Sequence, residues 1–235
     1  MRRCLLICEG PYDQLIFSIL KELFDESLLE VKPLCRCSLD TTNLVNHVDD
    51  LVNEILSKEH GYNRTDFDEI CFLVDSDGIF VPNALIFEDA SLPYTNYKED
   101  SIICPVKDSL ILRNKKRMEN VDDLIKDKRY WVFYNSRNLE HSFDSELVKH
   151  QSDKYKKRFA LMTFNQYEND KELFIKKLFE MNKSNSLNYY DSWEYLIRDL
   201  NSLSSCSNMF VFLVMHYYAL KTNYKELVKS LLKSS

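Results

Sequence analysis

The chain has 235 residues, of which 45% are hydrophobic, 29% charged and 13% aromatic, a composition typical of a globular protein rather than a disordered or fibrous one. Its formal charge of −6 excludes a uniformly basic surface for binding nucleic acid, although local basic stripes are compatible with it. Only three glycines occur, and neither the Walker A nor the Rossmann glycine pattern is present. The common nucleotide-binding loops are therefore excluded.

The first third of the chain alternates apolar runs with helical patterns. Short apolar runs predict strands at residues 3–8, 29–35 and 69–75. Between them, apolar residues at helical spacing predict helices at residues 13–25 and 42–58, the second capped by Thr41 or Thr42. Continuous apolar strands that alternate with helices indicate a parallel sheet flanked by helices, so the predicted fold class is α/β.

The rest of the chain is irregular at first and then helical. Residues 76–128 hold three of the five prolines, and we interpret them as loops with a strand at residues 101–105 and a helix at residues 121–128. A strong strand is predicted at residues 129–135. Further helices are predicted at residues 139–149, 170–181, 192–203, 209–221 and 224–232. We expect an α/β core over residues 1–135 and a helical C-terminal extension over residues 136–235, packed on that core.

The cysteines indicate a reducing compartment. Cys4, Cys8 and Cys71 lie inside apolar runs, where free thiols pack as small hydrophobes, so we expect a cytoplasmic protein without disulfides. Cys35 and Cys37 could form half of a metal site, but no second Cys or His pair at suitable spacing completes it, and zinc is not predicted. Four histidines lack a motif context and are interpreted as surface or core residues: His47, His60, His150 and His216.

Acidic residues follow two of the predicted strands. Glu9 ends the first apolar run, with Asp13 one helical turn later, and Asp75 and Asp77 end the third. Because the carboxyl ends of parallel strands meet at one edge of a sheet, we expect Glu9, Asp75 and Asp77 to converge there. Alternation along an extended segment puts the two aspartates on one side, about 7 Å apart. Carboxylates at such spacing suit Mg²⁺ or Mn²⁺.

The same residues also fit a purely structural interpretation. Glu9 and Asp13 could cap the first helix, and the Asp-Ser-Asp-Gly sequence could be an ordinary turn after a strand. Gly10 and Gly78, two of the three glycines, stand within the acidic motifs, which suggests turns that a Cβ would obstruct. The occurrence of both motifs, in this order on alternate elements, favours the metal site.

Together the two motifs resemble the TOPRIM domain of topoisomerases, primases and OLD-type nucleases. The resemblance rests on the sequences ICEGPYD at residues 7–13 and FLVDSDG at residues 72–78, and it covers residues 3–135. It implies a TOPRIM-like parallel sheet, with Glu9 as a metal ligand or acid/base group and Asp75 and Asp77 as the metal-binding pair. Asp13 is similar to the second acid of OLD-type members.

Stand-alone TOPRIM-like effectors of bacterial phage defence look closest. In those effectors a further acid follows the late strand, a position that Glu140 resembles, although Glu140, like Arg137 and His141, could equally be an exposed helix-start residue. The resemblance implies a magnesium- or manganese-dependent endonuclease with four catalytic residues: Glu9, Asp75, Asp77 and Glu140. DNA, transfer RNA and other RNA stay open as substrates. An ATPase partner is compatible, because the chain has no ATP motif, and so is a homo-oligomer; no membrane partner is expected.

Two alternatives to the enzyme are kept. One is a TOPRIM-like module whose carboxylates bind metal weakly and which inhibits or senses a protein partner. The other is a non-catalytic scaffold protein.

Basic segments predict where nucleic acid would bind. Lys154, Lys156, Lys157 and Arg158 surround Tyr155, whose ring could stack on a base, and residues 113–117 form a second basic run. Solvated charged faces are the alternative explanation for both runs.

Overall fold

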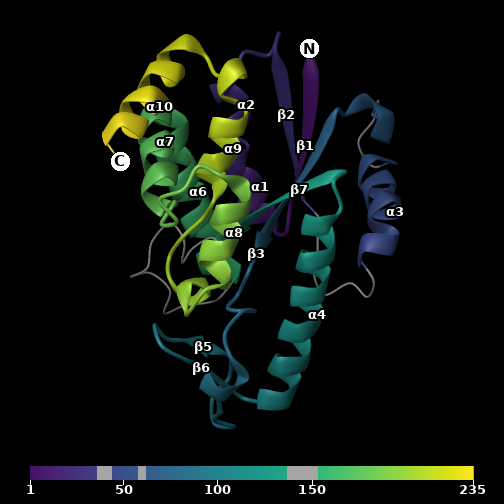
Figure 1. Cartoon of the computed structure of the whole chain (residues 1–235), viewed down its shortest axis with the longest axis vertical. Coiled ribbons are helices and arrows are strands. Elements are labelled where there is room, and N and C mark those ends of the chain that lie inside the picture. The colour runs from purple at the N-terminus through teal and green to yellow at the C-terminus, as the bar shows by residue number, and fades with distance from the viewer. Residues whose placement is uncertain (36–43, 58–61, 137–152, 235) are drawn as a thin grey trace.

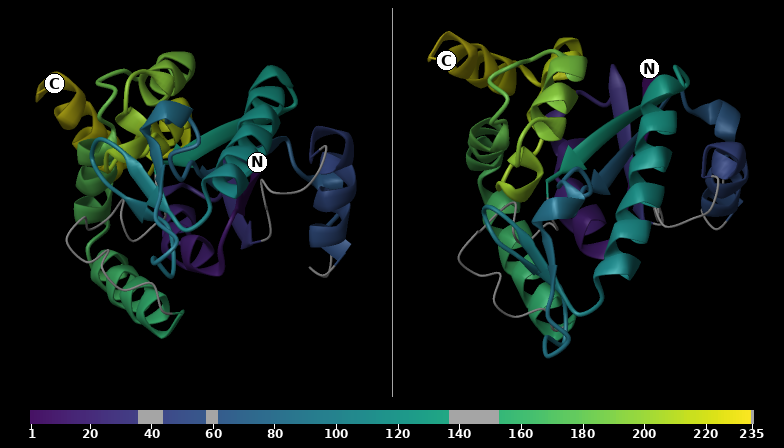
Figure 2. Two further views of the ribbon diagram at one scale, coloured as in Figure 1. Left: turned by 90° about the horizontal axis from the view of Figure 1, so that it is seen from below. Right: turned by 60° about the horizontal axis from the view of Figure 1, so that its bottom comes forward.

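A computed structural model describes residues 1–35, 44–57, 62–136 and 153–234. Its centre is a four-stranded parallel sheet in the order β2-β1-β3-β7, and a three-stranded sheet in the order β4-β6-β5 lies beyond the carboxyl ends of the central strands (Figures 1 and 2). The strands are β1 (Arg2–Cys8), β2 (Leu29–Cys35), β3 (Glu69–Asp75), β4 (Ile86–Glu88), β5 (Asn96–Tyr97), β6 (Ile102–Cys104) and β7 (Tyr130–Asn135).

Helices cover both faces of the central sheet. They are α1 (Pro11–Phe17), α2 (Leu20–Leu23), α3 (Leu44–Ser57), α4 (Lys107–Lys126), α6 (Asp153–Asn169), α7 (Lys171–Met181), α8 (Tyr189–Ile197), α9 (Met209–Met215) and α10 (Thr222–Ser234). α3 and α4 lie on one side of the sheet, and the C-terminal helices lie on the other (Figure 1). Among the described residues, no helix is long and apolar enough to cross a membrane.

The α/β class and the parallel sheet expected from the sequence are confirmed. The predicted strands at residues 29–35 and 69–75 coincide with β2 and β3, and those at residues 3–8 and 129–135 differ from β1 and β7 by one residue at one end. β1, β3 and β7 have nearly continuous buried runs because helices cover both sides of the sheet, whereas β2, at the edge, alternates buried with half-buried residues. The periodicity of a buried run and its flanking turns was therefore sufficient to locate each strand.

The single helix predicted at residues 13–25 is wrong. The structure has two helices, α1 and α2, separated at Ser18 and Ile19. The Ser18 hydroxyl donates to the Leu15 carbonyl oxygen at 2.6 Å, a local bond with which serine competes against the helical ladder. The apolar spacing continues across the break because both helices pack on the same core.

The largest difference between the predicted and the observed elements lies in residues 76–128, which were predicted to be mostly loops. Instead of a helix at residues 121–128, α4 begins at Lys107 and runs for 20 residues to Lys126. The middle of α4 lacks an apolar stripe because its inward face carries polar residues there: Asn114, Arg117 and Asn120 are all buried. A helix that buries polar groups against a polar site gives no amphipathic signal.

Smaller differences occur in the C-terminal region. The helix predicted at residues 192–203 is α8, which begins at Tyr189 and ends at Ile197, followed by one 3₁₀ turn. The helix predicted at residues 209–221 ends at Met215. α6 was not predicted, whereas α7 and α10 match their predicted positions within two residues. The predicted helix at residues 139–149 and the capping residues Thr41 and Thr42 lie outside the described residues.

The C-terminal region closes the outer edge of β7 with hydrogen bonds. Val132 donates its backbone N–H to the Tyr189 hydroxyl at 3.0 Å, and its carbonyl accepts from Trp193 Nε1 at 2.9 Å. Tyr134 donates its backbone N–H to Asn208 Oδ1 at 2.7 Å, and its carbonyl accepts the Asn208 N–H at 3.2 Å. Side chains thus replace the missing neighbouring strand, and β7 is not an open edge.

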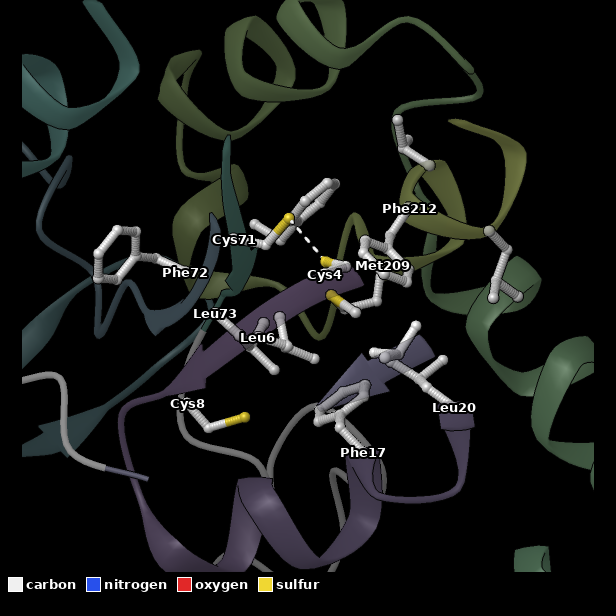
Figure 3. Close-up of a cluster of buried hydrophobic side chains, with 14 of the residues drawn as sticks. Cys4, Leu6, Cys8, Phe17, Leu20, Cys71, Phe72, Leu73, Met209 and Phe212 are labelled. Carbon is white, nitrogen blue, oxygen red and sulfur yellow. Dashed lines mark hydrogen bonds between the residues drawn. The ribbon is translucent and has the colours of Figure 1, made fainter. Parts of the chain in front are cut away.

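Apolar packing joins the same two regions. One buried cluster contains residues of β1 and β3 together with residues of α9, among them Cys4, Cys71, Met209 and Phe212 (Figure 3). Phe212 packs edge-to-face on Phe133 of β7, with ring centroids 5.4 Å apart. The helical C-terminal region and the sheet therefore share one core.

We expect Asn208→Ala to destabilise the protein by about 1–3 kcal/mol, because the buried Tyr134 N–H would lose its acceptor. Urea unfolding monitored by circular dichroism measures this free energy. Asn165→Ala, on the exposed face of α6, is the control and should change it by less than about 0.5 kcal/mol. Equal effects of the two substitutions would contradict the assigned role of Asn208.

Candidate functional site

Glu9 stands where β1 ends, and its carboxylate bridges to the neighbouring strand. Glu9 Oε2 accepts the backbone N–H of Asp75, the last residue of β3, at 2.9 Å. The Glu9 side chain is 18% exposed, so this edge is partly open to solvent. The expected convergence of Glu9 and Asp75 at one sheet edge is confirmed.

Arg117 of α4 binds both Glu9 and Asp75. Its guanidinium contacts both Glu9 carboxylate oxygens, with Nη1 to Oε1 at 3.0 Å and Nη2 to Oε2 at 3.1 Å. Nη2 also donates to the Asp75 carbonyl oxygen at 2.6 Å. Arg117 is only 3% exposed, so this bidentate pair is shielded from water and is stronger than a surface ion pair.

A second arginine, one turn earlier on α4, holds the next part of the loop. Arg113 Nη2 donates to the Asp77 carbonyl oxygen at 3.5 Å and to the Tyr97 hydroxyl at 3.3 Å. Tyr97 belongs to β5, so the small sheet also borders the site. The two arginines thus hold both aspartate carbonyls of the Asp-Ser-Asp sequence from one helix face.

Asp13 and Asn135 complete the edge. Asn135, the last residue of β7, is fully buried, and its Nδ2 lies 3.4 Å from both Asp13 Oδ1 and Asp75 Oδ1. The Asn135 Oδ1 atom has no hydrogen-bond partner among the described residues. A buried amide oxygen without a donor is rare, and it is an unused oxygen ligand beside two carboxylates.

The structure explains why glycine stands at positions 10 and 78, within the two acidic motifs. Gly10 donates its N–H to Asp13 Oδ2 at 3.2 Å, and a Cβ at position 10 would lie 2.8 Å from that same oxygen. Gly78 has φ +66°, a conformation that L side chains rarely adopt. Asp77 precedes it with φ +46°, a left-handed conformation that aspartate and asparagine tolerate. The expectation that a Cβ would obstruct these turns is confirmed.

Burial and mutual repulsion disfavour the ionised form of the carboxyl groups at this site when no cation is bound. Loss of hydration raises the pKa of Asp75 well above its usual value, and the charges of Asp13, Glu9 and Asp77 raise it further, while Arg117 opposes them. Burial also raises the pKa of Glu9, although Arg117 and the Asp75 N–H lower it in part. Arg117 therefore does not offset the accumulated negative charge.

The oxygen donors are of the kind that Mg²⁺ and Mn²⁺ bind, but they are spread more widely than ligands around one ion. Among the described residues, the only set of three or more His, Cys, Asp or Glu ligand atoms within 4.8 Å of one another lies elsewhere, at Cys4, Glu69 and His216. Glu9, Asp13, Asp75 and Asp77 share an edge without meeting that spacing.

The other predicted site residues lie on α6 or outside the described residues. Glu140 lies outside the described residues, as does the side chain of Lys154. Lys156 is half-buried on α6, whereas Lys157 and Arg158 are exposed. The prediction missed Asn135, whose only signal was its place at the end of a strand. It noted residues 113–117 as a basic run but not that Arg113 and Arg117, four residues apart, face the acids.

None of the protein-family models, curated proteins or solved structures compared with this chain matches it.

We expect Asp75→Asn to raise the melting temperature of the metal-free protein at pH 7. The pKa of Asp75 is higher in the folded than in the unfolded state, so the folded state binds more protons between those pKa values and the free energy of unfolding falls as pH rises. Asparagine does not ionise, so the variant does not lose this part of the free energy of unfolding as the pH rises. The expected gain is about 2–4 °C, which ~1 kcal/mol produces in a chain of this size.

Thermal unfolding in the presence of a chelator, at several pH values, measures the difference. It should vanish below about pH 4, where Asp75 is protonated in both states. Asp123→Asn, an exposed site on α4, controls for the change in net charge. A lower melting temperature for Asp75→Asn than for this control at pH 7 would contradict the repulsion described here.

Proposed function

We propose that the protein is a metal-dependent nuclease that hydrolyses phosphodiester bonds. The observation that carries this proposal is the gathering of Glu9, Asp13 and Asp75, from three separate elements, around one sheet edge, where burial and mutual repulsion raise the pKa of Asp75. Such an arrangement favours a divalent cation over the empty site. The TOPRIM resemblance of the two acidic motifs points to the same chemistry and to an effector of bacterial phage defence.

Each residue of the edge has a role in this proposal. Asp75 and Asp77 would hold Mg²⁺ or Mn²⁺, with Asp13 and the free Asn135 Oδ1 beside them. The ion would activate water and offset charge on the leaving oxygen. Arg117 binds both Glu9 oxygens and the Asp75 carbonyl, so that the two strand ends keep their relative position.

The nucleic-acid partner is proposed from exposed cations on α6. Lys157 and Arg158 face solvent, and α6 packs against α1, which begins at the acidic edge. Phosphates bound there would approach the carboxylates along one side of the molecule. The acidic edge alone would repel a polyanion, so binding needs such a basic segment.

A second candidate is a protein-interaction module without catalysis. It is favoured by the Arg117 guanidinium, which takes both Glu9 oxygens that a metal would use, and by the wide spacing of the carboxylates. In that case Arg117 would permanently replace the cation. Metal binding separates the two candidates, because only the nuclease needs it.

Asp77→Asn should abolish cleavage, with a loss of about 100-fold or more, since loss of even an outer ligand commonly reduces metal-site activity by 10–100-fold. Asparagine keeps the left-handed backbone of Asp77 and removes only the charge. Cleavage of single- and double-stranded DNA and RNA, including transfer RNA, is measured with Mn²⁺ or Mg²⁺.

Asp123→Asn should leave that activity unchanged. Binding is followed independently by the melting temperature of the wild type with and without millimolar Mn²⁺. If Mn²⁺ does not shift that temperature and no substrate is cleaved, the interaction module is the better description. Equal activity of wild type and Asp77→Asn would remove Asp77 from the site.

A separate prediction concerns the basic segment of α6. Replacing Lys156, Lys157 and Arg158 together by glutamine should weaken nucleic-acid binding and reduce the slope of log K against log salt by about 2–3, because fewer counterions are released. The matched control replaces three lysines of α10: Lys225, Lys229 and Lys233. If both triple variants change the slope equally, α6 has no specific role.

A further inference from the structure

A second group of ligand-type side chains lies toward the opposite end of the central sheet, far along the strands from the acidic edge. Cys4 of β1, Glu69 at the start of β3 and His216 after α9 place their ligand atoms within 4.8 Å of one another. Cys4 and Glu69 are register partners, so their side chains point to the same face. Cys4 is fully buried, His216 is 2% exposed, and the Glu69 side chain is 14% exposed.

The His216 ring carries the evidence for a cation at this group. Its Nδ1 lies 2.9 Å from the Phe212 carbonyl oxygen, a contact in which only Nδ1–H can donate. Its Nε2 lies 2.8 Å from Glu69 Oε2. A neutral ring with Nδ1–H has a lone pair on Nε2, and that lone pair would face the lone pairs of the carboxylate. A cation must therefore lie at this contact, either a proton or a metal ion.

The sulfur atoms favour the metal ion. Cys71 Sγ lies 3.5 Å from Cys4 Sγ (Figure 3), and Cys71 stands two residues after Glu69, on the same face of β3. Two thiolates on a tetrahedral zinc ion, with Zn–S bonds of about 2.3 Å, lie about 3.8 Å apart, close to the separation found here. Imidazole, thiolate and carboxylate together are a zinc donor set and a poor one for Mg²⁺.

The residues around Cys4, Glu69 and His216 are arranged as around a structural zinc site, in which protein side chains supply all the ligands. The His216 Nδ1–H bond to a backbone carbonyl is the outer contact that orients most metal-bound histidines. Arg2 pairs with the other Glu69 oxygen, Oε1, and leaves Oε2 facing His216. Two thiolates and one carboxylate would give a zinc complex of charge −1, which the Arg2 guanidinium balances.

We propose that Cys4, Glu69 and His216 bind one structural zinc ion that ties β1 and β3 to the end of α9. Cys71 lies outside the group within 4.8 Å, but its Sγ is 3.5 Å from Cys4 Sγ, and a change of its side-chain position on zinc binding would make it the fourth ligand. Binding releases three protons to solvent, two from the thiols and the one held between His216 Nε2 and Glu69 Oε2, and forms two Zn–S bonds, one Zn–N bond and one Zn–O bond without any redox step. The site is independent of the acidic edge, whose ligands are all oxygen atoms.

The experiment uses the full chain purified without chelator or histidine tag. Elemental analysis should find about one zinc per chain, and Co²⁺ added to chelator-treated protein should give a thiolate-to-cobalt charge-transfer absorption band. Zinc at 100 times its Kd should raise the melting temperature of that protein by about 5–10 °C. The cobalt band and the zinc-induced shift should both persist in excess Mg²⁺, so neither readout depends on the acidic edge or on nuclease activity.

Variants then assign the ion to these residues. Cys4→Ser and His216→Gln should each lose the zinc and the cobalt band, whereas Cys206→Ser, which alters a buried thiol beside Ser204 and Ser136, should keep both. Wild-type protein with less than about 0.1 zinc per chain, no cobalt band and no thermal shift would overturn the proposal and leave only a hydrogen bond between His216 Nε2 and Glu69 Oε2. A band that persists in Cys4→Ser would also overturn it.

Discussion

The hydrogen bond from the Asp75 N–H to the Glu9 carboxylate continues the β1–β3 ladder beyond the last paired residues of both strands. It fixes one acid against the backbone of another, and Arg117 locks the pair by binding Glu9 and the Asp75 carbonyl together. Because Arg117 belongs to α4, this contact ties that helix to the ends of β1 and β3. Arg113 of the same helix contacts the Asp77 carbonyl and Tyr97, so α4 also joins the turn and the small sheet to this edge.

Closure of the β7 edge is the second constraint on the architecture. A parallel strand at the end of a sheet leaves N–H and C=O groups unpaired, and here Tyr189, Trp193 and Asn208 supply the partners. Tyr189 and Trp193 belong to α8 and Asn208 precedes α9, so the C-terminal region is held by directional bonds as well as by apolar packing. Asn135 at the end of the same strand lies beside Asp13 and Asp75.

Sequence periodicity predicted what depends on local patterns and missed what depends on burial of polar groups. The central strands and the meeting of Glu9 with Asp75 were predicted because buried parallel strands have a continuous apolar signature and share one edge. Most of α4 was missed because Arg117 and Asn120 replace the apolar stripe that marks a helix. His216 was set aside because its partners, Cys4 and Glu69, are distant in sequence, and no spacing rule relates residues brought together only by the fold.

The two ends of the sheet differ in ligand chemistry, and this difference makes the two proposals independent. At the carboxyl end the donors are carboxylate and amide oxygens, which suit a hard cation that exchanges its water. Toward the amino end the donors are two thiols, one imidazole and one carboxylate, which suit zinc. Zinc prefers thiolate and imidazole ligands and Mg²⁺ prefers oxygen ligands, so each ion would bind at its own site. Cys4 lies near the start of β1 and Glu9 follows its end, so the two sites share a strand but no ligand.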